Sequence, residues 1–550
     1  MPARRKKRFS SVIYDPIQAA ADAKQAEPLD RWASTRSKFP KLVGWIEKWT
    51  QRAEVILDVE RVETRAGKIS VTARYHRLPR SIDEDFRQTS KILGTGFNGA
   101  VRLAESRSNP EHKYAVKGLR LHSRKLDERE RLIREMEIYL TLDHPHIARL
   151  FEVFEAQHRL DLVMECMEGG ELFDRIANKK GVFPEEDAAD AIWQMLLAVN
   201  YIHTRGIVHR DLKLENFMYV NKDGNILKLI DFGFSKLWDP NSNKTMGLTV
   251  GTLSYMAPEV IKHCYTSQCD MWSLGVIAFS LLMGYMPFSG SAHQQSASIE
   301  RGKYLIKPAK WDALSAQAQD FLTSLLQVDH EKRLNAEAAL KHQWITTMKK
   351  EESTIDSSVV DALRTFTHAS HFRRCCMAMM AWSLSTDERI QVSAFFIALD
   401  TSRDGHITRV ELQAALQDKF NVGEEELEQI LNAMDSNKDG EIHYSDFLAA
   451  MVSTKIQLHD EILKATFNKF DIDRTGEITE SNLRQVLGDM YDGVKVKTLM
   501  EDLELAQRNR ISYPEFEKYL LNSPVSRASR TKRILTPQRG WLSCFPCCSA

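Results

Sequence analysis

Four polar residues near the middle of the chain have the types and spacing that phosphoryl transfer requires. Asp211, Lys213 and Asn216 lie within one short run, and Asp231 follows in an Asp-Phe-Gly triplet fifteen residues after Asn216. A carboxylate can orient or deprotonate a hydroxyl group, and a lysine can neutralise charge on a phosphoryl group. An amide and a second carboxylate are hard oxygen ligands for Mg²⁺. We therefore predict that Asp211 and Lys213 are catalytic and that Asn216 and Asp231 bind Mg²⁺.

A glycine-rich stretch upstream of these residues can hold the phosphates of a nucleotide. Residues 94–101 contain three glycines, and the lack of side chains there lets backbone N–H groups close over a triphosphate. Such a stretch alone is weak support, but Lys117 follows at strand spacing and can reach the α and β phosphates. We predict ATP binding, and the candidate residues are Gly94, Gly96, Gly99, Val101, Ala115 and Lys117.

Lys117 needs an acidic partner that fixes its position. Glu135 and Glu137 both lie in a stretch after Asp127 that is predicted to be helical. We favour Glu135 as the catalytic partner, because eight residues separate it from the helix break at Asp143, and Glu137 remains the competitor.

Three twelve-residue loops far downstream carry oxygen-bearing side chains at regular positions. They begin at Asp400, Asp435 and Asp471, 35 and 36 residues apart, and each has a glycine at position 6. Oxygen ligands at positions 1, 3 and 5 with a glycine at position 6 are typical of the calcium loops of helix-loop-helix units. A degenerate fourth copy begins at Glu504, 33 residues after the third. The repeat therefore predicts four such units and Ca²⁺ binding.

The residue at position 12 differs among the loops and ranks their predicted affinity for Ca²⁺. Glu411 can bind with both carboxylate oxygens, Asp446 is one methylene shorter, and Asn482 is neutral. The first loop is therefore the strongest predicted site, and the occupancy of the third stays open. Arg508 stands at a ligand position of the fourth copy, which we predict to be structural. The predicted ligands are Asp400, Ser402, Asp404, His406 through its carbonyl, Thr408 and Glu411 in the first loop, Asp435, Asn437, Asp439, Glu441 and Asp446 in the second, and Asp471, Asp473, Thr475 and Glu477 in the third.

Two different frameworks must position these two sets of residues. Between Phe86 and Trp344 the pattern runs from strand, glycine turn and strand to long helices, which predicts a mixed α and β region. Before each calcium loop, apolar residues recur at helical spacing, which predicts an all-α region of paired units. The stripes are Val392, Phe395, Phe396 and Leu399, then Leu427, Ile430, Leu431 and Met434, then Leu463, Thr466, Phe467 and Phe470.

The extension before Phe86 shows two weaker patterns. Leu42, Trp45, Ile46 and Trp49 follow helical spacing. An alternating pattern from Lys68 to Tyr75 predicts a strand. The role of the extension is not readable from its sequence.

A basic and apolar segment separates the two main regions. A polar stretch at residues 349–358 marks the boundary, and residues 359–382 follow with three arginines among apolar side chains. A calmodulin-like module of four helix-loop-helix units needs such a helix as its target. We predict that the module binds this segment within the same chain, and a passive packed linker is the alternative. The apolar anchors are Val359, Leu363, Phe366, Phe372, Cys376, Met379 and Met380.

Composition and cysteine usage indicate the surroundings of the protein. The 550 residues include 75 basic and 75 acidic side chains, without a signal sequence or a run of 18 apolar residues. Eight cysteines without paired spacing indicate a reducing compartment, so we expect a cytoplasmic protein without disulfides. Basic residues gather at 4–8 and 527–539, which favours anionic surfaces, and we predict no nucleic-acid partner.

Three of the cysteines lie in the last seven residues, directly after the basic tail. Acylation of Cys544, Cys547 and Cys548 would attach the chain to a membrane. An unmodified tail is the alternative, and zinc is disfavoured because no histidine or second cysteine pair completes a tetrahedral site. Pro2 replaces the glycine that N-myristoylation requires, so we expect no lipid at the front of the chain.

The motifs between residues 86 and 344 stand in the order and spacing that eukaryotic protein kinases show, and this part of the chain resembles that family. The resemblance implies a two-lobed fold with ATP at the hinge between the lobes. Glu259, at the end of the activation segment, needs a buried cationic partner, for which Arg333 is the candidate. Asp270 is predicted to hold the catalytic loop in place.

The same resemblance assigns further residues of the ATP site. It makes Met164 the gatekeeper and places Glu165 and Met167 in the hinge. Glu171 stands where an acidic residue contacts the ribose of ATP and an arginine three positions before the phosphorylated residue of a substrate. Lys213 in the catalytic loop implies specificity for serine and threonine. The implied partners are protein substrates with basic residues near the phosphosite.

The full order of catalytic region, junction and four helix-loop-helix units resembles the calcium-dependent protein kinase family from about residue 86 to residue 520. The resemblance implies an α+β, non-specific serine/threonine protein kinase that Ca²⁺ activates. Without Ca²⁺ the junction would block or distort the catalytic domain, and with Ca²⁺ the module would capture the junction. A calcium-dependent scaffold with an inert kinase fold is one alternative, and regulation by free calmodulin is another. We predict an N-terminal extension (1–85), a kinase domain (86–344), an autoinhibitory junction (345–385), a calmodulin-like domain (386–521) and a basic tail (522–550).

Overall fold

The computed structural model describes the chain from residue 59 to residue 521, apart from short gaps. The gaps are residues 79, 97–98, 121–125, 157–158, 179–182, 240–244, 248–249, 349–354, 453, 457 and 502–509. The helix predicted around Leu42 to Trp49, the start of the fourth calcium loop at Glu504 and the cysteine tail lie outside the described residues.

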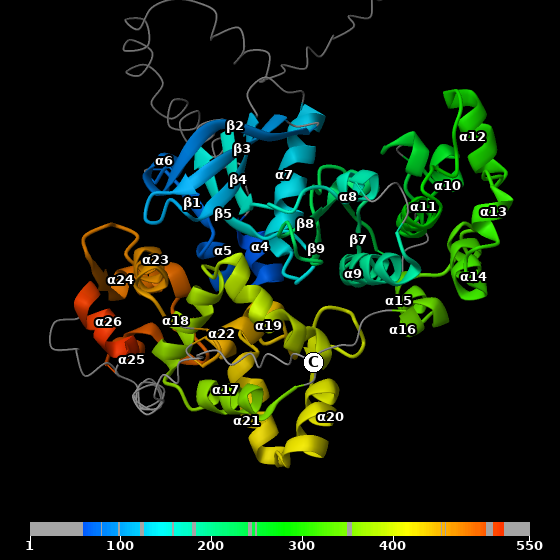
Figure 1. Ribbon diagram of the computed structural model, residues 1–550. Helices are drawn as coiled ribbons and strands as arrows, with labels where there is room; N and C mark the ends of the chain where they lie inside the picture. Colours follow the sequence, from blue (N-terminus) through cyan, green and yellow to red (C-terminus); the bar gives the residue numbers. More distant parts are fainter. Residues whose placement is uncertain are drawn as a thin grey trace, which may run out of the picture. The chain divides into compact units, whose positions relative to one another are not determined.

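A six-stranded sheet forms the first part of the catalytic region (Figure 1). Its strand order is β1-β5-β6-β4-β3-β2, with β1 parallel to β5 and the other neighbours antiparallel. The hairpin of β2 and β3 ends at the pair Gly96 and Gly99, so the glycine-rich stretch is the turn between these strands. Beside the sheet lies the helix α7 (Leu126–Thr141). The strands are β1 (Tyr75–Arg77), β2 (Phe86–Gly96), β3 (Gly99–Ser106), β4 (Lys113–Arg120), β5 (Leu150–Ala156) and β6 (Arg159–Glu165).

The strand predicted from Lys68 to Tyr75 is wrong over most of its length. The helices α4 (Val59–Ala66) and α5 (Lys68–Thr72) follow each other through Gly67, whose φ of 79° allows the turn, and only β1 is extended. The alternating pattern arises because Val71 and Ala73 are buried by elements that lie far away in the sequence. Tertiary contacts therefore decide between helix and strand here.

Helices dominate the rest of the catalytic region. α11 (Gln268–Met283) is buried from Cys269 to Met283, which explains its nearly continuous apolar sequence. α9 (Glu185–Thr204) carries three acidic residues in its first turn, where they interact favourably with the helix dipole. The catalytic loop follows α9 and β7. The remaining elements are α8 (Leu172–Asn178), β7 (Ile207–Val208), η1 (Leu214–Asn216), β8 (Phe217–Tyr219), β9 (Leu227–Leu229), β10 (Lys236–Leu237), η2 (Leu253–Tyr255), α10 (Pro258–Ile261), α12 (Ala292–Glu300), α13 (Pro308–Trp311), α14 (Ala316–Leu325), α15 (Ala336–Leu340) and α16 (Gln343–Met348).

Four helix-loop-helix units follow in two pairs, which confirms the predicted repeat and forms what we call the calcium module. The first pair joins where Ile407 faces Ile442, and the second joins where Ile478 faces Ile511. Apolar residues of both pairs belong to one buried core. The elements are α19 (Thr386–Leu399), β11 (Ile407–Thr408), α20 (Arg409–Phe420), α21 (Glu424–Met434), β12 (Glu441–Ile442), α22 (Tyr444–Met451), α23 (Asp460–Phe470), β13 (Glu477–Thr479), α24 (Glu480–Leu487), β14 (Met490–Tyr491), β15 (Val494–Lys495), α25 (Val496–Glu501), β16 (Arg510–Ser512) and α26 (Tyr513–Leu521).

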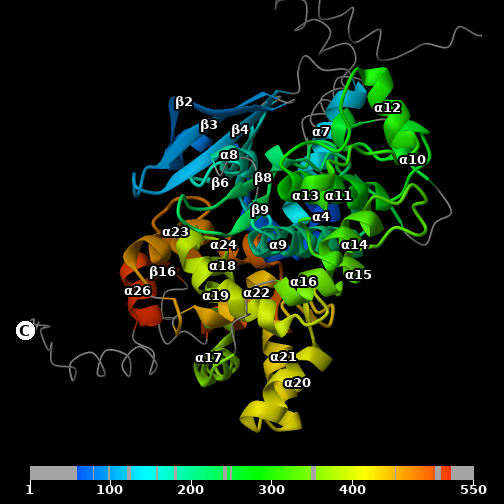
Figure 2. The same ribbon diagram turned by 45° about the vertical axis from the view of Figure 1, so that its right-hand side comes forward.

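The junction is enclosed by the calcium module. Its two helices are α17 (Ser357–Thr367) and α18 (His371–Ala381), and α18 packs against α22 and α23, which lie near it in Figure 2. The anchors Phe372, Cys376 and Met379 are at most 1% exposed, and they belong to the core of the module. The predicted contact between the junction and the module is therefore present in the structure.

Candidate functional site

The catalytic loop places Asp211, Lys213 and Asn216 next to one another. Lys213 Nζ lies 2.7 Å from Asp211 Oδ2, and the hydroxyl of Thr252 donates to Asp211 Oδ1 at 2.9 Å. The side-chain amide of Asn216 donates to the carbonyl oxygen of Asp211 at 2.7 Å. The loop therefore presents an oriented carboxylate with an ammonium group and an amide beside it.

Asp270 on α11 fixes the backbone of this loop. Its two oxygens accept the N–H groups of His209 and Arg210, both at 2.8 Å. Arg210 has a φ of 70°, a left-handed conformation that costs about 1 kcal/mol or more for a residue with a side chain. Burial opposes the charge of Asp270, but a hydrogen bond with His203 keeps its pKa below the ordinary value. The predicted contact between Asp270 and the catalytic loop is confirmed.

Lys117 on β4 lies between two carboxylates. Its Nζ is 2.8 Å from Glu135 Oε1 on α7 and 3.0 Å from Asp231 Oδ1. Burial opposes the charge of Lys117, but the two carboxylates raise its pKa above the ordinary value, so the group stays protonated. Glu137 forms an ion pair with Arg61 instead. The structure thus joins the sheet, α7 and the Asp-Phe-Gly triplet at one ammonium group.

The other predicted nucleotide-binding residues lie on strands next to Lys117. Val101 on β3 faces Lys117 in the sheet register, and Ala115 on β4 faces Met164 on β6. Gly94 has no atom within 4 Å of the position that a Cβ would take, so its backbone is open to a ligand. The strand register therefore gathers these residues on the part of the sheet that contains Lys117.

The side chain of Glu165 is buried in an ion cluster that reaches the calcium module. Lys228 Nζ lies 2.8 Å from Glu165 Oε1, and Arg389 Nη2 on α19 lies 2.9 Å from the same oxygen. Thr386 at the start of α19 donates to it at 2.8 Å. Burial alone would raise the pKa of Glu165, but Arg389 and Lys228 lower it to about 2. The carboxylate therefore links the end of β6 to the calcium module, and its side-chain partners leave only the backbone of Glu165 open to a ligand.

An acidic cluster lies near the start of α8. Met167 and Glu171 follow β6, and burial together with the charges of Asp174 and Glu215 raises the pKa of Glu171. Glu215 belongs to the catalytic loop and is exposed. The sequence analysis did not single out Glu215, although its position next to Asn216 could have drawn attention to it.

Two contacts fix the activation segment. Arg333 forms a two-pronged ion pair with Glu259, with Nη2 3.1 Å from Oε2, which confirms the predicted pair. The sequence analysis missed Thr252, which holds Asp211. The signal that could have revealed it is the preceding Gly251, whose φ of 106° and close approach to the catalytic loop leave no room for a side chain.

The three calcium loops share one backbone conformation. Position 4 is left-handed in each, with φ values of 63° at Arg403, 62° at Lys438 and 56° at Arg474. The glycine at position 6 has a φ of 84°, 88° or 81°. In each loop the aspartate at position 1 accepts the N–H of that glycine at 2.9 Å. Each loop therefore curls around the carboxylate that begins it.

The first loop gathers three carboxylates. Glu411 accepts the N–H groups of Ser402 at 2.7 Å and Thr408 at 2.9 Å, which turns it toward the start of the loop. Burial, together with the charges of Asp404 and Glu411, raises the pKa of Asp400 to about 7. A cation relieves the repulsion among such groups, so these residues fit Ca²⁺.

The second and third loops end in weaker ligands. Asp446 accepts the hydroxyl of Ser436 at 2.6 Å and the N–H of His443 at 3.1 Å, and burial raises its pKa to about 6. Asn482 accepts the N–H of Thr479 at 2.9 Å. Both side chains take the place that Glu411 has in the first loop, but Asn482 brings no charge.

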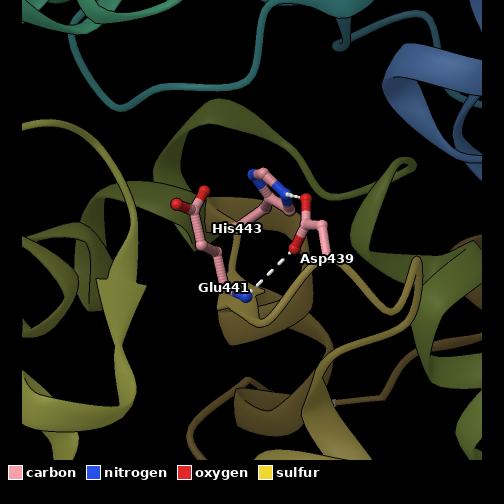
Figure 3. Close-up of side chains that lie close together, drawn as sticks. All are labelled: Asp439, Glu441 and His443. Atoms are coloured by element: carbon pink, nitrogen blue, oxygen red, sulfur yellow. Dashed lines mark hydrogen bonds and ion pairs between the residues drawn. The ribbon is translucent and has the colours of Figure 1, made fainter.

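Asp439, Glu441 and His443 form a compact cluster on the second loop (Figure 3). His443 Nε2 lies 2.8 Å from Asp439 Oδ2, and one potential ligand atom of each residue lies within 4.8 Å of the others. Arg205, at the end of α9, lies 2.9 Å from His443 Nδ1 and also contacts His406 of the first loop. Arg205 therefore links one histidine of each of the first two calcium loops to the catalytic region.

Other residues of these loops also touch the catalytic region. Asn200 on α9 donates to the carbonyl oxygen of Arg403 at 2.7 Å. Asp143, between α7 and β5, accepts the N–H of Ser445 at 2.6 Å. The first two calcium loops are therefore part of the contact surface between the two regions.

Comparison with known proteins agrees with this arrangement. The protein kinase domain family matches residues 87–345, and the EF-hand domain pair matches residues 389–452. The chain is 32% identical over 450 residues to calcium-dependent protein kinase 3 of Plasmodium berghei (strain Anka), which covers 79% of this chain and 80% of that protein. It is 33% identical over 455 residues to calcium-dependent protein kinase 4 of Plasmodium falciparum (isolate 3D7). This alignment covers 78% of this chain and 85% of that protein. The chain belongs to the calcium-dependent protein kinases.

Proposed function

We propose that this chain transfers the γ-phosphoryl group of ATP to serine and threonine hydroxyls with Asp211 and Lys213 at the reacting groups. As a calcium-regulated protein kinase it uses ATP, a divalent metal ion and Ca²⁺. The observation that carries the proposal is the position of Lys117 Nζ, 2.8 Å from Glu135 and 3.0 Å from Asp231. A lysine that binds the α and β phosphates must be held in position, which the contact with Glu135 does. It must also lie beside the metal site, which the contact with Asp231 provides.

Asp211 and Lys213 act on the two reacting groups. The Asp211 carboxylate orients the substrate hydroxyl and accepts its proton, while the hydroxyl oxygen forms a bond to the γ phosphorus. The bond from that phosphorus to the oxygen bridging the β phosphate breaks, and ADP leaves. Lys213 Nζ, 2.7 Å from Asp211, supplies positive charge to the transferring group.

Asn216 and Asp231 would hold Mg²⁺. The bond from Asn216 to the backbone of Asp211 keeps its amide oxygen available, and Asp231 offers a carboxylate within 3.0 Å of Lys117. Two hard oxygen donors near the phosphate-binding lysine fit this ion, whose chemistry there is to neutralise phosphate charge.

Ca²⁺ would activate the enzyme through the first loop. Binding removes the repulsion among Asp400, Asp404 and Glu411 and stabilises the module that encloses the junction. Phe372 and Met380 of the junction are buried in that module, which supports a state in which the junction is held away from the catalytic loop. The second loop would bind Ca²⁺ more weakly, with Mg²⁺ competing.

The acidic cluster of Glu171 and Glu215 favours substrates with basic residues near the phosphosite. Burial, together with the charges of Asp174 and Glu215, raises the pKa of Glu171. A guanidinium group of the substrate would relieve the repulsion among these carboxylates. Glu171→Gln should raise KM for a peptide with arginine three positions before the serine and leave KM for its alanine counterpart unchanged.

One assay tests the enzyme against an inert scaffold. The full-length chain receives a basic peptide and radiolabelled ATP, with Ca²⁺ or with a chelator. We expect calcium-dependent transfer, which Asp211→Asn and Asp231→Ala each lower by several orders of magnitude without unfolding the chain. Near-normal turnover of either variant would overturn the assignment. An inactive wild type would favour the scaffold, and activity that requires added calmodulin would favour an external regulator.

The tail would attach the enzyme to membranes when acylated. None of the helices in the described ranges is long and apolar enough to cross a membrane. Cationic contacts of about 1 kcal/mol each are reversible, whereas a buried acyl chain adds about 0.8 kcal/mol per CH₂ group. Cell fractionation should find the wild type on membranes in a hydroxylamine-sensitive form. A variant with Cys544, Cys547 and Cys548 changed to serine should be absent from membranes, and equal distributions would refute the anchor.

A further inference from the structure

Residues 59–77, which we call the bridging segment, contact both the catalytic region and the calcium module. They comprise α4, α5 and β1, and they contain neither a catalytic motif nor a calcium loop. We propose that the bridging segment positions α7, and through it Glu135, when the calcium module is docked. This inference rests on the proposed role of the Lys117–Glu135 pair.

One side of the bridging segment holds the helix that carries Glu135. α4 packs against α7, and Arg61 forms an ion pair with Glu137, two residues from Glu135. Arg74 Nη2 donates to the carbonyl oxygen of Leu140 near the end of α7. The segment therefore contacts α7 next to the residue that binds Lys117 and again in its last turn.

The bridging segment is also anchored in the kinase sheet. Tyr75 pairs with Val153 in the parallel ladder of β1 and β5, and Val153 donates its N–H to the carbonyl oxygen of Arg74 at 2.6 Å. Arg74 Nη1 donates to the carbonyl oxygen of Leu150 at 3.4 Å. β5 is an inner strand of the sheet, so its hydrogen bonds with Arg74 hold this residue in place relative to the sheet.

The other side of the segment packs into the calcium module. The hydroxyl of Thr72 donates to the carbonyl oxygen of Val486 on α24 at 3.0 Å, and Ala73 belongs to the core of the module. The guanidinium carbon of Arg74 lies 3.9 Å from the ring centroid of Trp382, the residue after α18. One side chain thus bonds to α7 and β5 and also stacks on the end of the captured junction.

Trp382 supports a second buried arginine. Arg149 lies 4.2 Å from the same ring centroid, and none of its guanidinium nitrogens has a hydrogen-bond partner within the described ranges. Asp143, 3.7 Å from Arg149, also accepts the N–H of Ser445 from the calcium module. Burial and the charge of Arg149 lower the pKa of Arg74 to about 9. The aromatic face that the two arginines share therefore comes from the junction, which the module holds in place.

This dependence couples docking to the position of α7. Two adjacent buried cations are unfavourable unless aromatic faces and acceptors compensate them. When the module is docked, the ring of Trp382 compensates both, and Arg74 keeps its bonds to α7 and β5. When the module leaves, the ring leaves with it and that arrangement loses stability. By linkage, a correctly placed α7 also favours the docked module.

The test uses the full-length chain with Arg74→Met, which keeps an unbranched apolar side chain but removes the charge and the hydrogen bonds. In saturating Ca²⁺ we expect kcat to fall about tenfold, the effect expected for residues that couple two sites. The calcium-free rate should match the wild type, whereas the calorimetric Ca²⁺ affinity should fall because docking and the position of α7 are linked. Ca²⁺ should slow hydrogen exchange of α7 in the wild type but not in the variant.

A matched control lies three residues further along the bridging segment. Arg77 is about half exposed, with 47% of its side-chain surface accessible, and it pairs with Glu155 on β5. Arg77→Met removes an arginine from β1 without touching Trp382 or α7, so it should keep the full calcium response.

Changes at Trp382 test the same contact from the side of the junction. Trp382→Leu should reproduce the loss seen with Arg74→Met, whereas Trp382→Phe should retain most of the response. The double variant Arg74→Met with Trp382→Leu should be no worse than either single variant. If Arg74→Met does not fold, the ion pair between Arg61 and Glu137 tests the role of the bridging segment instead. The variants are Arg61→Glu, Glu137→Arg and the double variant that exchanges the two charges. Each single reversal should weaken calcium activation, and the exchange should restore it.

A wild-type calcium response in both Arg74→Met and Trp382→Leu, additive losses in the double variant, or no rescue by the charge exchange would overturn the proposal. Glu135→Gln separates this failure from a failure of the proposed function. If Glu135→Gln keeps full activity, both proposals fall. If Glu135→Gln is inactive while Arg74→Met behaves as the wild type, only the role of the bridging segment is lost.

Discussion

The catalytic residues work as small groups of charges held close together. Lys117 stays protonated because Glu135 and Asp231 outweigh the cost of its burial. Asp211 is held in the same way by the ammonium group of Lys213 and the hydroxyl of Thr252. Removing one member leaves the others buried without their partner, so substitutions here should matter more than changes to surface ion pairs.

Thr252→Val tests whether the orientation of Asp211 limits the reaction. The change keeps the shape of the side chain but removes the hydroxyl that donates to Asp211 Oδ1 at 2.9 Å. A hydrogen bond to a charged group contributes about 1.5 kcal/mol, so we expect kcat to fall about tenfold with little change in KM. Thr252→Ser keeps the donor and should remain near the wild type in steady-state assays. Equal kinetics of the two variants would contradict the prediction.

Glu411→Gln should weaken calcium activation more than any equivalent change in the other loops. The change replaces one of the two carboxylate oxygens of Glu411 with an amide nitrogen and removes the negative charge that the first loop offers to Ca²⁺. Glu515→Gln, at the corresponding place of the fourth unit, is the matched control. Glu515 accepts the N–H of Ser512 at 2.9 Å, and this unit has Ala506 and Arg508 at ligand positions 3 and 5. Activity measured across a calcium titration compares the two, and equal shifts would refute this ranking of the sites.

The grouping of Asp211, Lys213 and Asn216 could be predicted because the three residues share one short run of sequence. The contact from Thr252 to Asp211 could not, because it depends on how the activation segment folds back over the catalytic loop. Arg389 also carried no local signal, since its partner Glu165 lies in another region of the chain. Its position on an amphipathic helix is equally typical of an exposed residue.

At the scale of helices and strands, the spacing of apolar residues predicted the type of element correctly wherever one face of that element is buried. Leu463, Thr466, Phe467 and Phe470 on α23 are all buried, as their spacing predicted. The bridging segment was the exception, because α5 is short and buried on more than one side. Its alternating pattern reflects contacts with the sheet and the calcium module, and neither is visible in a local window of sequence.

Arg389→Met tests how firmly α19 is tied to the hinge. The change leaves Glu165 with Lys228 as its remaining cation in the cluster. We expect the free energy of unfolding in Ca²⁺ to fall by about 2 kcal/mol, because the buried carboxylate loses one of its two cations. Arg409→Met, which breaks exposed ion pairs of α20, is the control and should change stability little. Denaturant unfolding that gave both variants the same stability would contradict the prediction.

At the scale of the whole molecule, the calcium module contacts the rest of the described chain at several places. Among them are the end of β6 through Arg389, the end of α9 through Arg205, and the bridging segment through Val486. The order of the regions along the chain could be predicted from the repeats and motifs. Their mutual docking could not, because it depends on surfaces that only complement each other once both regions have folded.

Two cysteines in the junction make this docking measurable. Cys375 and Cys376 on α18 are fully buried, whereas Cys264 in the catalytic region is exposed. Burial raises the pKa of both junction thiols, so they stay protonated and unreactive while the module encloses them. Their reactivity therefore reports whether the junction is captured.

Removal of Ca²⁺ should expose both junction thiols. We expect brief alkylation followed by peptide mass spectrometry to find Cys264 modified in all conditions, and Cys375 and Cys376 modified only with a chelator. Glu411→Gln should show modified junction cysteines at Ca²⁺ concentrations that protect the wild type, because its first loop closes less readily. Protection of Cys375 and Cys376 in the chelator would contradict calcium-driven capture. It would mean that the junction stays enclosed in both states and that Ca²⁺ acts on the docking contacts at Arg205 instead.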